Sequence, residues 1–282
     1  MLWAAFKQRM RELGYEQGRG TSYEFRWAHG EPDRLPALAA ELSALNVDTI
    51  VTAGTPAAFA AQRATTTIPI VMATGVSVGT DLNQGQAGTG RNVTGMSDLA
   101  PGLSEQRLGL LRELVPDAAL YAVLWDQTNP SGTLAIREFQ DAAHISGSSL
   151  SVFGVQGLAG LDEALAAMAR AGAGGFIVVP SAMFFADRKR LVDLALLHRL
   201  PAIYVRHEYV DVGGLMAYGT PIRDNYLRAA AYVDRILKGA RPSDLPVEQP
   251  TAFELTVNLK TAQALGLAMP RSILLRAHQV RD

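Results

Sequence analysis

Hydrophobic residues along this chain follow two patterns that succeed one another. In one they have helical spacing, and in the other they form short runs that are continuous or alternate with polar residues. Trp3, Phe6, Met10 and Leu13 recur at helical spacing, and Gly14 follows at the point where a helix would stop. We therefore expect a helix at the start of the chain. The two patterns then succeed one another, which predicts β-strands and α-helices in turn.

The first hundred residues continue with strands and helices of ordinary length. Aromatic residues alternate with charged ones over positions 23–27, which is typical of a strand with one more polar face. Thr55-Pro56 predicts a helix start, with the Thr55 hydroxyl as the cap and the proline in the first turn. We expect strands over 23–27, 47–53 and 68–73, and a helix over 35–45.

A second series of elements follows a polar, glycine-rich stretch at 81–94. Its short apolar strands lie between helices, which predicts a mostly parallel sheet that is buried on both faces. We expect helices over 103–115, 131–146, 160–171 and 187–199, and strands over 120–125, 150–155, 175–180 and 202–205. The end of the chain predicts a strand at 213–218, a helix from 226, a proline-rich connector at 241–250, a strand at 253–259, a helix to 266 and a last element at 272–276.

Composition narrows the classes of function. The chain has 282 residues, 48% hydrophobic and 19% charged, which is typical of a folded globular protein. A formal net charge of −1 argues against a nucleic-acid partner. No apolar run approaches the roughly 20 residues of a membrane span, so we expect no membrane insertion of this chain. The absence of cysteine excludes disulfides and thiol catalysis.

No motif for catalysis, metal binding or phosphate binding is present. The five histidines show no metal-ligand spacing, and no GxSxG sequence occurs. The glycines at 85–90 lack the GK[ST] ending of a phosphate loop. We therefore predict a protein that is not an enzyme, with no cofactor and no metal. Residues 1–10 also lack the apolar segment of a secretion signal.

Two long segments resemble one known family. They are LPAIYVRHEYVDVGGLMAYG at 200–219 and YLRAAAYVDRILKGARPSDLPVEQPTAFELTVNLKTAQALGLAMPRSILLRA at 226–277. Together they are similar to the C-terminal half of the solute-binding proteins of bacterial ABC importers. The subgroup that they resemble includes tryptophan and tyrosine binders.

The resemblance implies a type I periplasmic-binding fold, in which two doubly wound parallel-sheet lobes are joined by three crossovers. We expect a first lobe of residues 1–97 plus 217–245 and a second lobe of 98–216 plus 246–282. Members of the family normally begin with a signal segment and a central strand, whereas this chain begins within the following helix. The first lobe is therefore expected to lack its first strand, through a truncation or a misplaced start.

The function implied by the resemblance is capture of a small-molecule solute in the cleft between lobes, possible solutes being amino acids and related carboxylates. Its partners would be the membrane subunits of an ABC permease, and it would act as a monomer in the periplasm or anchored at the cell surface. Three alternatives remain open: a ligand-sensing module of the same fold for a signalling partner, an enzyme on a related scaffold, and an inactive fragment.

Candidate binding residues follow from the rule that ligands of doubly wound sheets bind outside the carboxyl ends of the strands. In the first lobe, helix N-termini, hydroxyls and close backbone approach favour a carboxylate. Thr55 can equally act only as a helix cap. The first-lobe candidates are Thr52, Gly54, Thr55, Thr74 and Gly75.

The second lobe offers side chains with other chemistry. Trp125 is suited to stacking on a ligand and Asp126 to pairing with an ammonium group, although a buried tryptophan and a turn-forming aspartate give the same sequence. Arg206 is a candidate for binding a carboxylate and Glu208 for binding an ammonium, with surface ion pairs as the alternative. The second-lobe candidates are Trp125, Asp126, Asn129, Pro180, Ser181, Tyr204, Arg206, Glu208 and Tyr218.

Overall fold

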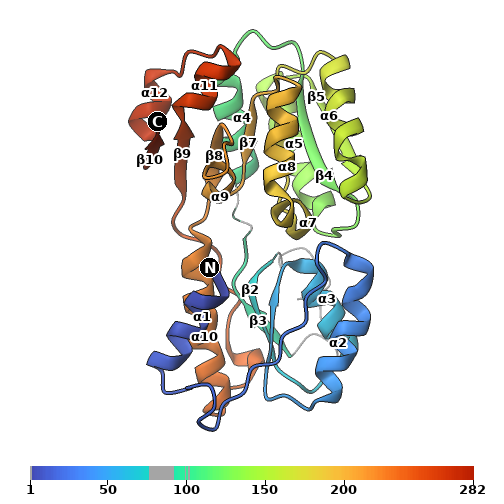
Figure 1. Cartoon of the computed structure of the whole chain (residues 1–282), viewed down its shortest axis with the longest axis vertical. Helices are drawn as coiled ribbons and strands as arrows, with labels where there is room; N and C mark the ends of the chain where they lie inside the picture. Colours follow the sequence, from blue (N-terminus) through green and yellow to red (C-terminus); the bar gives the residue numbers. More distant parts are fainter. Residues whose placement is uncertain (1, 76–91, 99, 101) are drawn as a thin grey trace. The chain divides into compact units, whose positions relative to one another are not determined.

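The computed structural model describes residues 2–75, 92–98, 100 and 102–282. The chain forms two compact units, each built from two stretches of sequence (Figure 1). Unit 1 comprises Met1–Ala100 and Pro221–Thr251, and unit 2 comprises Pro101–Thr220 and Ala252–Asp282. The chain changes unit three to six residues after the positions 97, 216 and 245 that the family resemblance implies. The glycine-rich stretch before the first of these changes lies largely outside the described residues.

Unit 1 contains a parallel sheet with strand order β1-β2-β3, formed by β1 (Ile50–Ala53), β2 (Ile70–Thr74) and β3 (Val93–Gly95). Successive side chains of β2 point to opposite sides of the sheet, and helices cover both sides. Ile70 and Met72 pack with α2 (Leu35–Ala44) and α3 (Thr55–Ala64). Val71 and Ala73 pack with α1 (Leu2–Glu12) and α10 (Ile222–Leu237). Unit 1 is therefore a doubly wound α/β unit.

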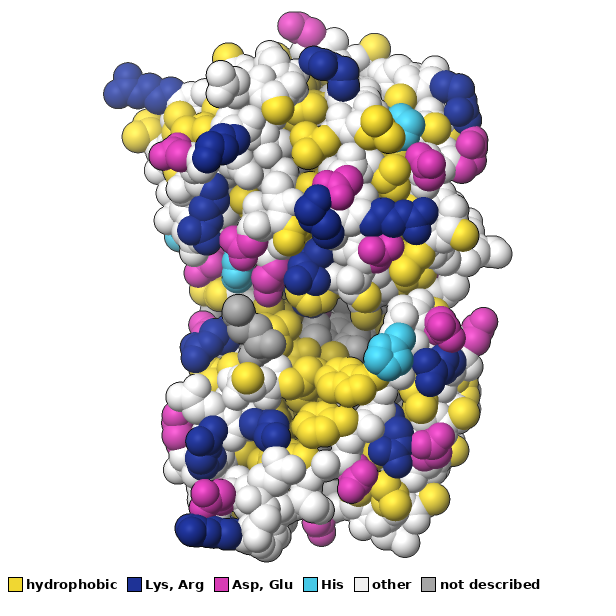
Figure 2. Space-filling model, in the orientation of Figure 1, with side chains coloured by type: hydrophobic (Ala, Val, Ile, Leu, Met, Phe, Trp, Pro, Cys, Tyr) yellow, Lys and Arg dark blue, Asp and Glu magenta, His cyan; other side chains and the backbone are white. Residues whose placement is uncertain are grey.

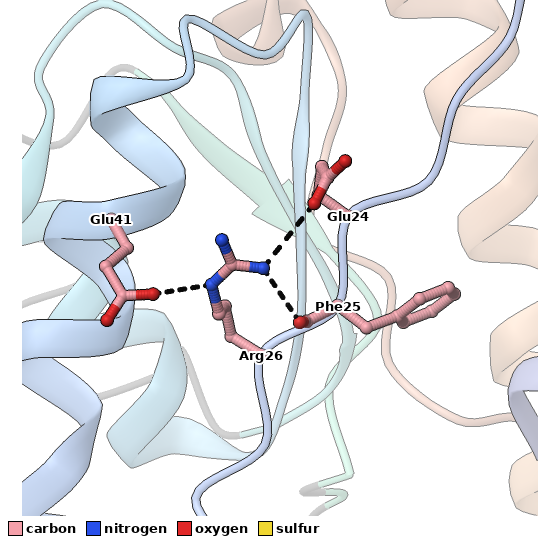
Figure 3. A network of polar contacts seen from close by, with 4 residues as sticks. All are labelled: Glu24, Phe25, Arg26 and Glu41. Carbon is pink, nitrogen blue, oxygen red and sulfur yellow. Dashed lines mark hydrogen bonds and ion pairs between the residues drawn. The ribbon is translucent and has the colours of Figure 1, made fainter.

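The predicted strand at 23–27 is wrong, because this segment is extended but belongs to no sheet. The aromatic and charged residues alternate because the two sides of the segment have different surroundings. Phe25 and Trp27 stack with ring centroids 5.7 Å apart, and Trp3 meets both of them edge-on. Arg26 lies on the other side, where its Nε donates to Glu41 of α2 at 2.6 Å and Nη1 donates to the Phe25 carbonyl (Figure 3). Side-chain contacts therefore hold a segment whose pattern resembles that of a strand.

Unit 2 contains a seven-stranded sheet of order β10-β9-β8-β7-β6-β4-β5. All neighbours in it are parallel except the antiparallel pair β8 and β9. This α/β architecture with two mostly parallel sheets confirms the predicted fold class. The strands are β4 (Tyr121–Asp126), β5 (Leu150–Val155), β6 (Gly175–Val178), β7 (Ala202–Tyr204), β8 (Met216–Gly219), β9 (Glu254–Asn258) and β10 (Gln279–Arg281).

Two hydrophobic cores lie on opposite faces of the unit 2 sheet. Leu124 and Phe176 belong to the core that also contains side chains of α6 (Leu161–Arg170) and α8 (Arg188–Leu197). Val123 and Ile177, one position away on the same strands, belong to the other core. The helices of that second core are α4 (Leu103–Leu114), α5 (Gly132–Ser146), α11 (Leu259–Leu265) and α12 (Arg271–Arg276).

Two short helices complete unit 2 at the carboxyl edge of its sheet, where the parallel strands end. They are α7 (Ala182–Ala186), which follows β6, and α9 (His207–Val210), which follows β7. Both are short because each immediately meets a further turn or helix. Three 3-10 turns occur elsewhere, at Pro32–Arg34, Leu158–Gly160 and Pro242–Asp244. The last of these lies within the predicted connector.

Candidate functional site

The turns after β1 and β2 form the carboxyl edge of the unit 1 sheet, and they lie close together. The Gly54 amide donates to the Thr74 carbonyl at 2.9 Å. A Cβ placed on Gly75 would lie 3.4 Å from the Thr55 nitrogen and 3.5 Å from its hydroxyl oxygen. The structure thus brings together four of the five candidates of the first lobe.

The N-terminus of α3 lies at this edge. Its N-cap is Gly54, with φ of 93°, a left-handed conformation that favours glycine. Thr55 is the first helical residue rather than the N-cap, so the prediction of a Thr55 cap is wrong. The helix dipole gives this end a partial positive charge. The Thr52 hydroxyl on β1 is buried and has no hydrogen-bond partner among the described residues.

An acidic residue that the sequence reasoning missed also lies at this edge. Thr74 donates its hydroxyl hydrogen bond to one carboxylate oxygen of Asp98, and Asn225 of α10 donates to the other at 3.3 Å. The Asp98 amide in turn donates to the Gly75 carbonyl at 2.6 Å. Asp98 therefore joins the turn after β2 to α10, and Thr74 contributes to that link.

In unit 2, a polar network ties the turn after β4 to the turn after β6. The buried Asp126 carboxylate accepts from the Thr128 amide at 2.9 Å, from the Thr128 hydroxyl at 2.6 Å and from the Ser181 hydroxyl at 2.7 Å. The Asn129 amide group donates to the Pro180 carbonyl at 3.0 Å. We call these five residues the β4–β6 network. It brings four predicted site residues together and engages their polar side chains internally.

Ser181 has a second role within this network. Its hydroxyl oxygen caps α7 by accepting from the amides of Met183 at 3.1 Å and Phe184 at 3.3 Å. The chain therefore enters α7 at a fixed angle. Trp125, beside Asp126, packs its ring against two glycines: a Cβ on Gly132 or on Gly154 would lie 2.6 Å from ring atoms. The contacts of Trp125 in unit 2 are thus packing contacts with α5 and β5.

Tyr204 does not lie on the surface of this edge. Only 1% of it is exposed, and its ring stacks on the Tyr209 ring at 4.7 Å within the core of unit 2. Burial raises the pKa of its hydroxyl well above the usual value. Alternate residues of a strand point to the same side, so Ala202 and Tyr204 share the face of β7 that is directed into this core. The Tyr204 side chain is therefore part of the core in this structure, and its contact with a ligand stays a prediction.

Around α7 and α9, a second group of polar and aromatic side chains lies at the same edge. The guanidinium carbon of Arg188 is 4.9 Å from the centre of the Phe185 ring, and that of Arg206 is 4.7 Å from the same centre. Phe185 meets Tyr209 edge-on at 6.0 Å. Glu208 follows Arg206 at the start of α9. These residues, Phe185, Arg188, Arg206, Glu208 and Tyr209, are the α7–α9 cluster.

Three atoms of the α7–α9 cluster are buried without a hydrogen-bond partner among the described residues. They are the Nε of Arg188, the Oε2 of Glu208 and the hydroxyl of Tyr209. The Nδ1 of His207 lies 3.8 Å from that Glu208 oxygen. Burial raises the pKa of Tyr209, and the nearby Arg206 and Arg188 act in the opposite direction. Arg188 and Tyr209 were not predicted as site residues.

Tyr218 lies on β8, outside both groups. Its hydroxyl donates to Gln106 of α4, and its carbonyl accepts from the Arg107 Nε at 2.9 Å. Burial raises the pKa of the Tyr218 hydroxyl. The residue is partly exposed and lies two residues before the chain leaves unit 2.

Neither the surface charge nor the potential metal ligands among the described residues indicate a further site. On the face shown in Figure 2, basic and acidic side chains are interspersed over each unit. Within the described residues, no group of three or more His, Asp or Glu is placed to hold a metal ion. No described helix is long and apolar enough to cross a bilayer.

Two doubly wound α/β units in one chain, each built from two stretches of sequence and each with polar turns at its carboxyl edge, define a bilobed ligand-binding protein. The chain belongs to the ABC transporter substrate binding protein family, whose model matches residues 3–281. Proteins of this family bind solutes and are not enzymes. The recognition made from residues 200–277 is confirmed.

Individual relatives agree with this assignment. A protein named tyrosine-binding protein from Clostridioides difficile is 23% identical over 265 residues, which are 93% of this chain and 75% of that protein. A conserved domain protein from Vibrio cholerae has a crystal structure with a TM-score of 0.91 and 26% identity, over 99% of this chain and 95% of that one. A Streptococcus pneumoniae ABC domain solved with L-Trp has a TM-score of 0.89 and 25% identity, over 99% and 94%.

Proposed function

We propose that this protein binds a free amino acid with an aromatic side chain, such as L-tyrosine or L-tryptophan, and delivers it to an ABC permease. One observation carries the proposal: a relative named for tyrosine binding and a structure solved with L-Trp both match more than nine tenths of this chain. Delivery to a permease follows from the family. The same reasoning supports a site of action outside the cytoplasm and transport as a monomeric binding protein.

The chemistry of the carboxyl edges agrees with an amino-acid ligand. An amino acid carries a carboxylate and an ammonium group about two bonds apart, so its site needs donors and an acceptor close together. Unit 2 offers Arg206 and Glu208 two positions apart at the start of α9. Unit 1 offers the N-terminus of α3, with Thr52 and Thr55 beside it.

The predicted site residues divide into two groups under this proposal. We propose direct ligand contact for those whose polar or aromatic surface borders the turns, and a supporting role for the β4–β6 network, whose side chains are already engaged. Direct contact is proposed for Thr52, Gly54, Thr55, Thr74, Gly75, Trp125, Arg206, Glu208 and Tyr218, and support for Asp126, Asn129, Pro180 and Ser181.

A thermal-shift panel tests the proposal first. The panel contains L-tyrosine, L-tryptophan and L-phenylalanine, with L-glutamate, L-lysine and ribose as ligands of other classes. A ligand at about 100 times its dissociation constant stabilises the folded state by about 2.7 kcal/mol. We expect that stabilisation only for aromatic amino acids. A shift with ribose alone, or no shift with any amino acid, would overturn the proposal.

Transport requires a second measurement, because binding alone also fits a sensing module. The protein would be loaded with radiolabelled amino acid and added to vesicles that carry the permease encoded beside its gene. We expect uptake that depends on ATP and on the loaded protein. Binding without uptake would favour the sensing alternative and leave the binding assignment in place.

A further inference from the structure

The α7–α9 cluster combines features that a protein interior normally avoids. Buried polar atoms in folded proteins are almost always hydrogen-bonded, because an unpaired one loses its bonds to water without replacement. Here three such atoms lie within one group of residues: Arg188 Nε, Glu208 Oε2 and the Tyr209 hydroxyl. One is a donor, one is an acceptor, and the hydroxyl can act as either.

The orientation of Arg188 is fixed by the protein itself. Its Nη1 donates to the Phe185 carbonyl at 3.0 Å, and its guanidinium lies over the Phe185 ring at 4.9 Å. No carboxylate of the described residues forms an ion pair with it within 4.0 Å, in contrast to Arg190, whose Nη1 lies 3.7 Å from Asp187. The guanidinium of Arg188 is therefore held in place by Phe185, and no carboxylate of the described residues neutralises its charge through a direct ion pair.

Phe185 and Tyr209 place the remaining groups around this guanidinium. The Phe185 ring contacts both arginine guanidinium groups and meets the Tyr209 ring edge-on. The side chains of Phe185, Arg188 and Glu208 are each partly exposed, so the cluster borders the surface at the carboxyl edge of the sheet. The cluster therefore presents cationic donors and the Glu208 carboxylate in one region of the sheet edge.

We propose that Arg188 and the Tyr209 hydroxyl bind the carboxylate of a zwitterionic amino acid, and that Glu208 binds its ammonium group. This inference rests on the proposed function and deepens it, because it assigns the two charges of the ligand to named residues of unit 2. Planar guanidinium donors suit a carboxylate, and hydrogen bonds between charged groups are about twice as strong as those between neutral ones.

The experiment measures dissociation constants for three ligands that differ only in charge. For L-tyrosine the partners are tyramine, which lacks the carboxylate, and 3-(4-hydroxyphenyl)propanoate, which lacks the ammonium group. If wild-type protein binds L-tryptophan more tightly, tryptamine and 3-(indol-3-yl)propanoate replace them. Calorimetry is performed on the full chain, with the melting temperature of each variant as the check on folding.

Each variant has its own expected pattern. Arg188→Ala should weaken binding of L-tyrosine and of the propanoate about 10- to 100-fold and leave tyramine unchanged. Glu208→Gln should weaken L-tyrosine and tyramine about 10-fold and leave the propanoate unchanged. Tyr209→Phe should weaken L-tyrosine about 5-fold without lowering the melting temperature. Arg188→Lys keeps the charge but loses the planar donors, so it should recover only part of the affinity.

Arg190→Ala is the matched control, because it removes a neighbouring arginine of the same helix that is paired with Asp187. Wild-type affinity for L-tyrosine in both Arg188→Ala and Arg190→Ala would overturn the inference and leave the proposed function standing. An equal loss for all three ligands would also overturn it, since that result indicates a general disturbance of the fold. If wild-type protein binds no aromatic amino acid, the proposed function fails, and this assignment fails with it.

Discussion

Two groups of residues at the carboxyl edge of the unit 2 sheet differ in how completely their polar atoms are paired. In the β4–β6 network, Asp126 accepts three hydrogen bonds and Ser181 both donates and accepts. In the α7–α9 cluster, a guanidinium nitrogen, a carboxylate oxygen and a phenol hydroxyl lack partners among the described residues. Full pairing is typical of a structural role, whereas an unpaired buried polar atom is costly and calls for an explanation. Substitutions in the two groups should therefore differ in their effects on stability.

The largest effect is expected for Asp126→Ala. Asp126 is 4% exposed and accepts from two residues through three hydrogen bonds. Its loss leaves the Ser181 hydroxyl and the Thr128 amide without their acceptor, so the free energy of unfolding should fall by about 3 kcal/mol. Urea denaturation followed by far-UV circular dichroism measures this. Asp193→Ala is the control, because its carboxylate is exposed and pairs with Lys189. A loss below about 1 kcal/mol for Asp126→Ala would show that the β4–β6 network does not have this structural role.

A smaller effect is expected for Ser181→Ala. This change removes the N-cap of α7 and one donor to Asp126. Loss of a serine cap costs roughly 1 kcal/mol, and the free energy of unfolding should fall by about that amount. The same denaturation experiment applies, with Ser243→Ala on an exposed turn as the control. If both serine variants behave alike, the cap contributes nothing to stability.

The smallest effect on stability is expected for Tyr209→Phe. The ring is 1% exposed and well packed, whereas its hydroxyl has no hydrogen-bond partner among the described residues. Removing an unpaired buried hydroxyl breaks no hydrogen bond of the folded state. The free energy of unfolding should therefore stay within about 0.5 kcal/mol of wild type or rise slightly. The midpoint of urea unfolding tests this directly. A fall of more than about 1 kcal/mol would show that the hydroxyl has a structural partner, and the contrast between the two groups would disappear.

Much of the fold could be predicted because burial on both faces of a sheet leaves a strong hydrophobic pattern. β5 has the bounds expected from the sequence, Leu150–Val155, and α4 and α5 end within one residue of expectation. The segment at 23–27 could not be predicted in the same way. Alternation reports which side of a segment is buried, but a strand also needs a neighbour with which to pair its backbone. Here the aromatic face is buried by Trp3 and the polar face by Glu41.

The positions of the candidate residues in the fold could be predicted better than the surroundings of their side chains. The rule of carboxyl ends correctly grouped Asp126, Asn129 and Ser181, since each follows a strand whose end is marked in the sequence. It gave no warning that Tyr204 faces the core, because the register of a three-residue strand is ambiguous. Arg188 was missed because Arg188-Lys189-Arg190 has the pattern of a solvent-exposed helix, and only the packing of α7 brings one of these residues onto Phe185.

The tryptophans are divided between the two units in a way that makes each unit visible by its own optical signal. Trp3 and Trp27 lie edge to face in unit 1 with ring centroids 5.9 Å apart, close enough for their electronic transitions to couple. Trp125 is the third tryptophan of the chain, and it lies in unit 2 beside Asp126. In Trp125→Phe, tryptophan fluorescence would come from unit 1 alone. In a variant with phenylalanine at positions 3 and 27, it would come only from the edge of unit 2 that carries the β4–β6 network, so unfolding of the two units can be followed separately.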